Sequence, residues 1–457
     1  MEMNMVSGEF GLPKNVTEVR VPIHFKDTLK LEGLKVFQTM MFNQGDAFDL
    51  WWTGQEFKDM RLESCEQMLN VGPEEIQKFR QENFDLAIGH FHDLCPIAIA
   101  EKIRISKVAW ITHGPSVYDF TAVQMGLRTL PSYVPHPLSS QGDSMAFFGR
   151  IVNVAWHFSG IDFVNLPTNL LHEENTMYKK KYINPDTGLD LWDLSQHVNV
   201  LFVNGERFLD FPRPLPISIT FMGEVGQKPK VGKSKISPEI EKILQKAKKG
   251  IVVFSLGTVS NTSSMPEHMA SSFVEAFGQF PEYEFLWRME VELPGASKFP
   301  NIHLLRWLPQ KDLMSHPQTK LLIAHGGFNS FLEASKAGIP VILMPLFADQ
   351  FINAKRAQRF GFCEILDKLS LSADSISEKI RTILSDSSYM RNAKKLSSML
   401  SDRPTPDQHA ILKHRLKLLV SPRDYFALKA AQKLNFFEFY SLDLLVILLA
   451  SILLLSY

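Results

Sequence analysis

The segment 321–350, LLIAHGGFNSFLEASKAGIPVILMPLFADQ, constrains the fold more than any other part of the chain. Its first four residues, LLIA, predict a buried strand of a parallel sheet, and the sequence HGG then interrupts the apolar run at the carboxyl end of that strand. A helix is predicted next, capped by Asn329 or Ser330 and ended by Gly338, and residues 339–344 predict a second strand. The segment is therefore expected to form a βαβ unit with a glycine-rich turn.

The turn and the start of this helix suit a diphosphate. Gly326 and Gly327 leave backbone N–H groups accessible, and the amino terminus of the helix adds further donors. One turn farther along the helix, the carboxylate of Glu333 can accept hydrogen bonds from the two hydroxyls of a ribose. After the second strand, Asp349 and Gln350 offer acceptors and donors for sugar hydroxyls. These residues together predict a binding site for a nucleotide sugar.

The spacing H-G-G-x-N-S-x-x-E, followed by G-I-P and P-L-x-x-D-Q and preceded by W-L-P-Q at 307–310, resembles the signature of the UDP-glycosyltransferases, in particular the UDP-glucuronosyltransferases of animals. Looser similarity extends over most of the chain, at FSLGT (254–258), LWR (286–288) and ERFLDFPRPLP (206–216). The nematode members resemble this chain more than the mammalian members do. The resemblance implies an α/β protein of GT-B architecture, in which two Rossmann-like domains face a cleft.

Hydrophobic patterns also predict two α/β halves. Strands are expected at 84–89, 108–112 and 198–204 in the first half, and at 250–256, 284–287 and 302–305 in the second. Further helices are expected at 97–103, 266–280, 348–360, 375–385, 389–399 and 407–419. Residues 131–175, rich in Pro, Gly and His, are expected to form loops and short helices of the kind that line acceptor pockets.

The predicted organisation has five parts. An acceptor-binding domain covers 1–225, a polar basic linker covers 226–237, and a UDP-sugar donor-binding domain covers 238–422. A connector at 423–438 and a transmembrane helix at 439–457 complete the chain.

The resemblance implies a role for each residue that matches a family position. Trp307 stacks on uracil, with ordinary core packing as the alternative, and Gln310 and Glu333 hold the nucleoside. The positions near the diphosphate are Ser255, Thr258, Arg288, His325, Gly327, Asn329 and Ser330. Asp349 and Gln350 hold the transferred sugar. The resemblance implies a UDP-sugar co-substrate without a metal ion or other cofactor, because histidine, arginine and helix-terminal donors take the place of the cation.

The implied reaction is an inverting transfer of a sugar, in the first place glucuronate, from UDP-glucuronate or UDP-glucose to a hydroxyl of a small lipophilic acceptor. In the family a histidine acts as the general base, and an aspartate in a segment FDxxxxD orients it. In FDLAIGHFHDLC (84–95) His90 stands at the aspartate position, with His92 and Asp93 close by. His90 is the candidate base, and a structural histidine in a strand-to-helix loop is the alternative.

Both ends of the chain depart from the family pattern. Residues 444–455 are an apolar run with a single polar residue, Ser451, which favours a membrane anchor over a buried core helix, and the basic tail that follows the anchor in the family is not seen. Residues 1–27 show no apolar core of a signal peptide, and 15–22 resembles the second strand of the family. We therefore expect the leader, the first strand and the family's catalytic histidine to be missing, as in a truncated isoform or an incomplete gene model.

Two functions are therefore open at this stage. The first is a single-pass enzyme of the endoplasmic reticulum membrane, with lumenal domains if a leader is supplied. The second is a non-catalytic UDP-sugar-binding protein that regulates family members through hetero-oligomers; a homo-oligomer is also open. Sequons at Asn15 and Asn261 permit glycosylation in the lumen.

Composition excludes some classes of partner. Lys+Arg and Asp+Glu are equal at 49 each, so nucleic acid is not an expected partner. The three cysteines, Cys65, Cys95 and Cys363, are isolated in the sequence, so neither a disulfide framework nor a zinc site is expected.

Overall fold

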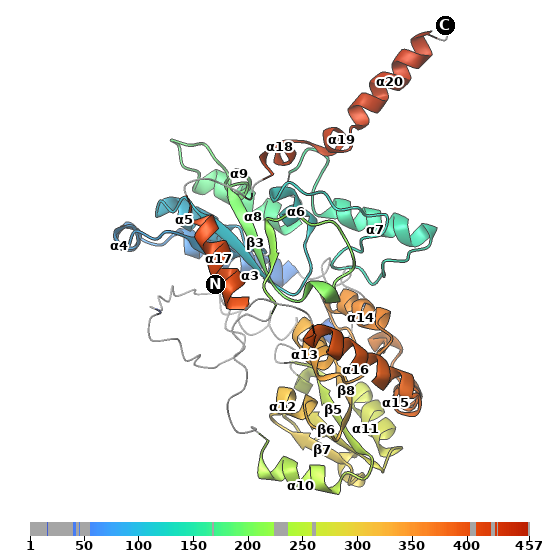
Figure 1. Ribbon diagram of the computed structural model, residues 1–457. Helices are drawn as coiled ribbons and strands as arrows, with labels where there is room; N and C mark the ends of the chain where they lie inside the picture. The colour runs from blue at the N-terminus through green and yellow to red at the C-terminus, as the bar shows by residue number, and fades with distance from the viewer. Residues whose placement is uncertain are drawn as a thin grey trace. The chain divides into compact units, whose positions relative to one another are not determined.

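The computed structural model describes residues 16, 40–42, 45, 55–166, 169–223, 236–257, 262–402, 408–421, 426 and 428–455. These residues divide into two compact units (Figure 1). Residues 58–223 and 408–455 belong to the first unit, and residues 236–257 and 262–402 belong to the second. The domain limits proposed from the sequence stay a prediction.

The first unit is built on a four-stranded parallel sheet of order β1-β2-β3-β4. Its strands are β1 (Ala87–His90), β2 (Val108–His113), β3 (Val198–Asn204) and β4 (Ile219–Phe221). Its helices are α3 (Gln55–Leu69), α4 (Pro73–Gln81), α5 (Cys95–Lys102), α6 (Asp119–Gln124), α7 (Phe147–Ser159), α8 (Asn169–Lys181), α9 (Leu191–Ser195), α17 (Gln408–Leu419), α18 (Lys429–Gln432), α19 (Phe436–Phe439) and α20 (Leu442–Leu455), with a 3-10 turn η2 (Arg207–Leu209).

Side chains alternate across this sheet, as they must in a strand. Trp110 and Leu201 pack on one face, in a core shared with α5, α8 and α9. Val200 and Phe202 pack on the other face against Leu419 of α17. A helix from the carboxyl-terminal part of the chain therefore covers the second face of the sheet.

The interval 131–175 differs from its prediction. It contains α7 and the first part of α8, each 13 residues long, in place of short helices. The polar residues Asn153 and His157 are the ones that α7 buries, one turn apart, so hydrophobic periodicity did not reveal this helix.

The expectation that no disulfide forms is wrong. Cys65 on α3 and Cys95 at the start of α5 are bonded, with their Cα atoms 5.6 Å apart, while Cys363 is free and buried. The two partners are 30 residues apart in sequence. The packing of α3 near α5 pairs them, which cysteine spacing alone does not show.

The second unit contains a six-stranded parallel sheet of order β10-β9-β8-β5-β6-β7. Its strands are β5 (Gly250–Ser255), β6 (Tyr283–Arg288), β7 (Ile302–Leu305), β8 (Thr319–Ala324), β9 (Val341–Leu343) and β10 (Cys363–Ile365). Its helices are α10 (Pro238–Lys246), α11 (Glu267–Gly278), α12 (Gln310–Met314), α13 (Phe328–Ala337), α14 (Gln350–Arg359), α15 (Ala373–Ser385) and α16 (Ser387–Ser401), with 3-10 turns η3 (Thr262–Ser264), η4 (Ala296–Lys298) and η5 (Lys368–Ser370).

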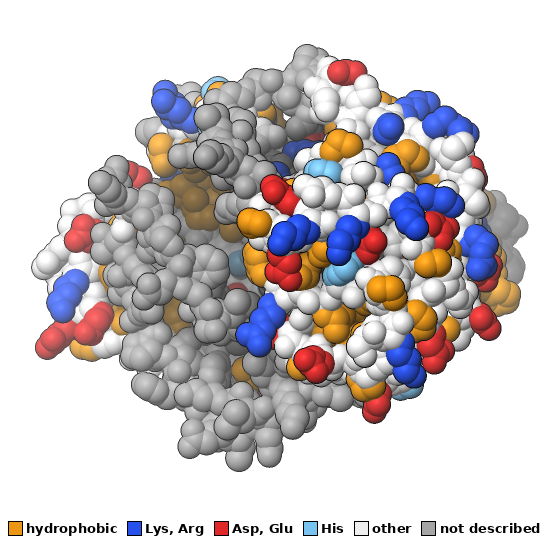
Figure 2. All heavy atoms as spheres, turned by 90° about the horizontal axis from the view of Figure 1, so that it is seen from below, with side chains coloured by type: hydrophobic (Ala, Val, Ile, Leu, Met, Phe, Trp, Pro, Cys, Tyr) orange, Lys and Arg blue, Asp and Glu red, His pale blue; other side chains and the backbone are white. Residues whose placement is uncertain are grey.

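The core of the second unit is aromatic. Phe273 and Phe277 of α11 pack on Phe254 of β5 and Trp287 of β6, with ring centroids 4.5 to 5.9 Å apart. Isoleucines of α15 join this core, and α12 and α13 lie on the other side of the sheet (Figure 1). On the face that Figure 2 shows, basic and acidic side chains are interspersed.

The strand order fixes where a ligand binds in such a unit. The chain starts the sheet at the central strand β5, adds β6 and β7 on one side, and then returns to add β8, β9 and β10 on the other. This is the doubly wound order, whose binding crevice lies at the carboxyl ends of the two strands where the direction reverses. Those strands are β5 and β8.

The prediction of a transmembrane helix over 439–457 is wrong for the described residues. A capping box at Asn435 starts the separate short helix α19. Ser441 has a left-handed backbone conformation, with φ 54°, and separates α19 from α20. The 14 residues of α20 give a length of about 21 Å. An apolar bilayer core is about 30 Å thick, and among the helices that the structure describes none is long and apolar enough to cross it.

Candidate functional site

The carboxyl ends of β5 and β8 lie side by side, with Ser255 in register with Ala324. Each strand runs into a glycine-containing turn, and Gly257 has φ 79° and Gly326 φ 86°. A Cβ on Gly257 would lie 2.7 Å from the His325 ring, and a Cβ on Gly327 would lie 2.5 Å from its Nε2 atom. The two glycines therefore make the room that the imidazole occupies at the switch point.

His325 has an unusual environment for a polar ring. Its Nδ1 atom is buried and has no hydrogen-bond partner among the described residues. Burial lowers the pKa of His325 to about 4, so the ring is neutral at pH 7. Buried polar atoms are normally paired, and this one stands at the ligand-binding edge of the sheet.

Helix α13 begins beside this ring. Its N-cap is Gly327, a residue without a side chain that could cap the first turn. The prediction that Asn329 or Ser330 caps the helix is wrong, because both lie inside its first turn; the left-handed stop at Gly338 is confirmed, with φ 69°. The amino terminus of a helix is a favourable place for an anion, because its backbone N–H groups point outward along the helix axis.

Three residues that the sequence assigned to the nucleoside and the phosphates are joined by hydrogen bonds. Gln310, the first residue of α12, donates from Nε2 to Ser330 Oγ at 3.1 Å and to Glu333 Oε2 at 2.9 Å. These contacts orient the Glu333 carboxylate before any ligand arrives.

Trp307 is 66% exposed, which excludes the alternative that it is a core residue. The guanidinium carbon of Arg288 lies 5.4 Å from the centre of its ring system. Arg288 also donates from Nη1 to the carbonyl oxygen of Gly257 at 2.5 Å and lies 3.8 Å from Glu290. A cation and an exposed aromatic surface therefore meet at the turn after β5.

The residues assigned to the sugar differ from each other. Asp349 Oδ2 accepts a hydrogen bond from Asn353 at 3.0 Å. Gln350 is buried, and its Oε1 accepts the N–H groups of Leu346 and Phe347 at 2.8 and 3.1 Å. The side-chain oxygen of Gln350 therefore holds the loop in place, so a contact with the sugar would be made by its side-chain nitrogen. Thr258, another predicted site residue, lies outside the described residues.

The sheet of the first unit ends in polar residues at its carboxyl edge. His90 ends β1, His113 ends β2, and Asn204 ends β3. His90 Nδ1 accepts from the N–H of His92 at 3.4 Å, and partial burial, with further contributions from Arg61 and His113, lowers the pKa of His90 to about 4. Its role as a base stays a prediction.

Sequence reasoning missed His113 and Asn204. The amide nitrogen of Asn204 lies 3.4 Å from His113 Nδ1. Each residue follows an apolar strand directly, the same signal that identified the turn after β8, so the sequence contained the information.

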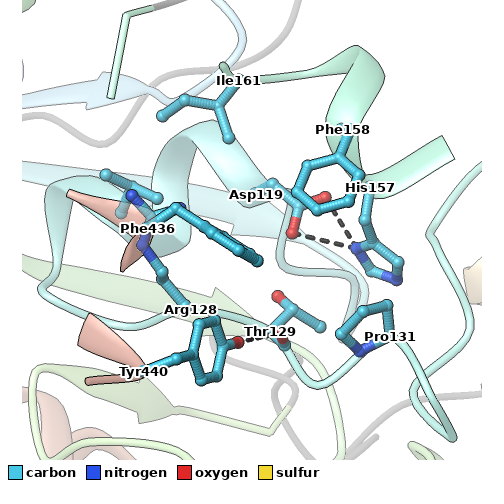
Figure 3. Close-up of a pocket in the computed structure, with 10 residues that line it drawn as sticks. Asp119, Arg128, Thr129, Pro131, His157, Phe158, Ile161, Phe436 and Tyr440 are labelled. Carbon is cyan, nitrogen blue, oxygen red and sulfur yellow. Dashed lines mark hydrogen bonds and ion pairs between the residues drawn. The ribbon is translucent and has the colours of Figure 1, made fainter. Parts of the chain in front are cut away.

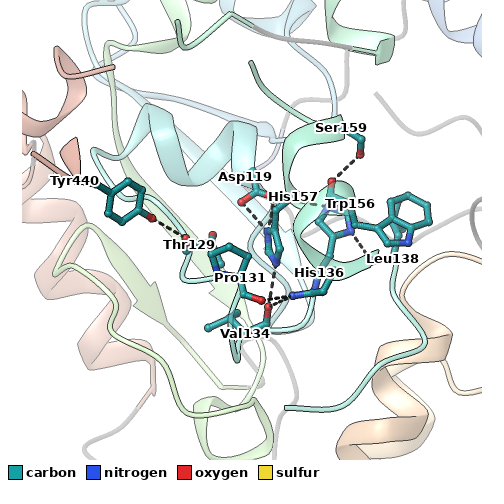
Figure 4. A network of polar contacts seen from close by, with 11 residues as sticks. Asp119, Thr129, Pro131, Val134, His136, Leu138, Trp156, His157, Ser159 and Tyr440 are labelled. Atoms are coloured by element: carbon teal, nitrogen blue, oxygen red, sulfur yellow. Dashed lines mark hydrogen bonds and ion pairs between the residues drawn. The ribbon is translucent and has the colours of Figure 1, made fainter. Parts of the chain in front are cut away.

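A buried ion pair lies elsewhere in the first unit (Figures 3 and 4). His157 Nδ1 is 2.8 and 2.9 Å from the two carboxylate oxygens of Asp119, and its Nε2 is 3.0 Å from the carbonyl oxygen of Val134. Burial opposes charge on both groups, but their mutual attraction prevails. It raises the pKa of His157 and lowers the pKa of Asp119. An acceptor lies at each ring nitrogen, so both N–H groups of a protonated His157 would have a partner.

His136 approaches the same carboxylate but stays neutral. Its Nε2 is 3.7 Å from Asp119, its Nδ1 accepts the N–H of Leu138 at 3.2 Å, and its ring stacks on Trp156. Burial lowers the pKa of His136 to about 3, despite the nearby carboxylate.

A cavity of about 30 Å³ adjoins this ion pair. Phe436 and Tyr440 close one side of it (Figure 3). Tyr440 donates its hydroxyl to the carbonyl oxygen of Thr129 at 3.0 Å, and Phe436 lies over the guanidinium of Arg128. Asp119 and His157 line the cavity together with Phe436 and Tyr440, so the ion pair borders the same cavity as the segment around α19.

Comparison with known proteins adds three findings. A sequence model of the family described as "UDP-glucoronosyl and UDP-glucosyl transferase" matches residues 6–457. Putative UDP-glucuronosyltransferase ugt-60 of Caenorhabditis elegans is 55% identical over 454 residues, which cover 98% of this chain and 88% of that protein. UDP-glucuronosyltransferase 1-2 of Rattus norvegicus is 29% identical over 415 residues, covering 87% and 72%.

Among solved structures, UDP-glucose: anthocyanidin 3-O-glucosyltransferase in complex with UDP matches with a TM-score of 0.52 at 16% identity, covering 78% of this chain and 81% of that chain. At this identity the match concerns the fold alone. It is the GT-B glycosyltransferase fold, with parallel sheets in two α/β domains.

Proposed function

The chain belongs to the UDP-glucoronosyl and UDP-glucosyl transferase family and is a UDP-glycosyltransferase, and we propose that it moves glucuronate to a hydroxyl of a small lipophilic acceptor. The relatives named as UDP-glucuronosyltransferases support glucuronate as the donor sugar. UDP-glucose is the second donor to compare.

The observation that carries the proposal is the switch point between β5 and β8. This region contains an exposed indole, a guanidinium, an unpartnered imidazole nitrogen and a helix start with a glycine N-cap, and a preoriented carboxylate follows one turn along the helix. We assign Trp307 to the uracil, Glu333 to the ribose, and His325 and the start of α13 to the diphosphate. We assign Asp349 to the binding of the sugar that is transferred.

The proposed reaction is a displacement at the anomeric carbon. The acceptor oxygen forms a bond to C1, the bond from C1 to the diphosphate oxygen breaks, and the acceptor proton passes to a base. Arg288 and the backbone donors of α13 stabilise the charge on the departing UDP. His90 is the proposed base, although a pKa of about 4 makes it a weaker base than an imidazole near neutrality.

We propose that the reaction needs no metal ion, because cationic and N–H donor groups already surround the diphosphate position. For the cellular location we propose the membrane of the endoplasmic reticulum, since the side chains of α20 are apolar and exposed. Association into homo- or hetero-oligomers is a further proposal, to be tested by size-exclusion chromatography.

Three measurements test the proposed function: UDP binding, transfer from each of two donors, and the effect of a chelator on the rate. Calorimetry with UDP measures donor binding, and transfer from UDP-glucuronate and from UDP-glucose to one phenol identifies the sugar. A chelator should leave the rate unchanged. Faster transfer from UDP-glucose would refute the assignment of glucuronate, and failure to bind UDP at millimolar concentration would refute the donor site itself.

A further inference from the structure

We propose that Asn353 is a positioning residue that holds the diphosphate-binding turn and the sugar-binding loop of the donor site at a fixed separation. The inference rests on the proposed function, because it takes the turn after β8 as the diphosphate site and Asp349 as the sugar contact. Asn353 itself touches neither ligand in this proposal.

Asn353 lies in the first turn of α14 and is fully buried, with 0% of its surface exposed. Its amide nitrogen donates twice. One hydrogen bond goes to the carbonyl oxygen of Gly326 in the turn after β8, at 3.0 Å, and the other goes to Asp349 Oδ2 in the loop after β9, at 3.0 Å. A single buried amide therefore connects the two parts of the site.

Arg356 determines which way this amide faces. Its Nη1 donates to Asn353 Oδ1 at 2.8 Å, and the arginine is itself 1% exposed. Because a guanidinium is only a donor, it fixes the oxygen of the amide on its own side and turns the amide nitrogen toward the site. Both polar atoms of the Asn353 side chain thereby have specified partners.

The two segments that Asn353 joins are also held by other contacts. In the loop after β9, Ala348 has φ 52°, and buried Lys368 donates to the carbonyl oxygen of Leu346 at 2.7 Å. The turn comes close to the start of α14, since a Cβ on Gly326 would lie 2.9 Å from the carbonyl oxygen of Gln350. Loss of the Asn353 link would therefore let two stiff segments shift against each other.

Such a shift would affect transfer more than nucleotide binding. The bond that breaks joins the sugar to the diphosphate, so its alignment depends on both segments, whereas UDP alone contacts only one. A misplacement of about 1 Å costs about 100-fold in rate in well-aligned sites. We expect Asn353→Ala to lower kcat/KM for the UDP-sugar about 10-fold to 100-fold, and to change the Kd of UDP less than about threefold.

Asn301→Ala is the matched control in the same unit. Asn301 is also buried, and its amide nitrogen donates to the carbonyl oxygens of Phe277 and Phe280 at 3.1 Å, but it precedes β7 at the opposite edge of the sheet. It should reduce thermal stability and leave kcat/KM per folded molecule unchanged. Asn353→Asp is the second Asn353 variant, because it keeps the acceptor for Arg356, removes the two donors and places an acceptor oxygen against Gly326 O and Asp349 Oδ2.

A double-mutant cycle separates positioning from a general loss of structure. If Asn353 acts through Asp349, then Asn353→Ala combined with Asp349→Ala should be no slower than Asp349→Ala alone. Losses that multiply, or a loss in both Asn353 variants no larger than in Asn301→Ala, would overturn the inference. Failure of the unsubstituted chain to bind UDP would instead overturn the proposed function on which it rests.

Discussion

Replacing Gly327 by alanine tests whether the His325 ring contacts the diphosphate. The added methyl group would lie 2.5 Å from His325 Nε2, a distance that forces the imidazole out of its position. Gly327 has φ −59°, so alanine brings no backbone strain, unlike at Gly257, where φ is 79°. The substitution therefore isolates the displacement of one ring.

The expected loss follows from the contact that the ring would make. A hydrogen bond to a charged group contributes about 1.5 to 3 kcal/mol, which corresponds to a loss of about 10-fold to 150-fold in affinity. We expect this loss for UDP and little change for uridine, which has no phosphates. His325→Ala should show the same pattern, and the double variant should lose no more than His325→Ala alone.

Isothermal titration calorimetry with UDP and uridine provides both affinities. Gly142→Ala serves as the control, because a methyl group there would meet nothing within 4 Å. Equal losses for UDP and uridine, or losses that multiply in the double variant, would refute the assignment of His325 to the diphosphate.

Three further predictions concern other parts of the chain. Trp307→Ala should weaken the binding of UDP and of uridine equally, by about 1 to 3 kcal/mol for one stacked base. Trp307→Phe should retain most of the affinity. A loss of affinity for UDP alone would show that uracil does not stack on Trp307. His157→Gln should destabilise the first unit by about 3 to 5 kcal/mol in thermal melts, because it leaves Asp119 as an unpaired buried charge. The pKa of His157 is raised above its ordinary 6.5, so the stabilisation by the pair is complete below pH 6.5 and is lost as the pH rises through the raised pKa. The pKa of Asp119 is lowered below its ordinary 3.8, so on the acid side the stabilisation is lost only as the pH falls through that lowered pKa. A difference in stability between His157→Gln and the unsubstituted chain that stays constant from about pH 5 to 9 would contradict this assignment. A chain ended after Tyr440 should be extracted from membranes without detergent, and carbonate-resistant association of that shorter chain would locate the membrane contact outside α20.

The donor-side residues were predictable because their chemistry is local. His325 and Asp349 follow predicted strands, so strand ends in the sequence already indicated them as binding residues, whereas Arg288 and Trp307 were assigned through the family resemblance. The strands β3 and β7 have the predicted bounds for the same reason.

Features that depend on distant packing could not be read in this way. The disulfide joins Cys65 to Cys95 through the packing of two helices, and the role of Asn353 depends on a turn 27 residues earlier in the chain. The prediction of one membrane helix over 439–457 failed for a local reason that composition does not register, because the left-handed residue Ser441 separates α19 from the 14-residue helix α20.

The two sheets end in different chemistry, and the difference matches what each side of a glycosyl transfer requires. In the second unit, β5 and β8 end in glycine-containing turns that expose backbone donors and an unpartnered imidazole nitrogen, which suits a dianionic leaving group. In the first unit, β1, β2 and β3 end in His90, His113 and Asn204, side chains that can form hydrogen bonds with neutral hydroxyls. Anion binding calls for donors that keep their proton, such as backbone N–H groups, whereas activation of a hydroxyl calls for a group that accepts a proton. Under the proposed function, the turns after β5 and β8 would therefore stabilise the leaving group, and a histidine at the edge of the other sheet would receive the acceptor proton.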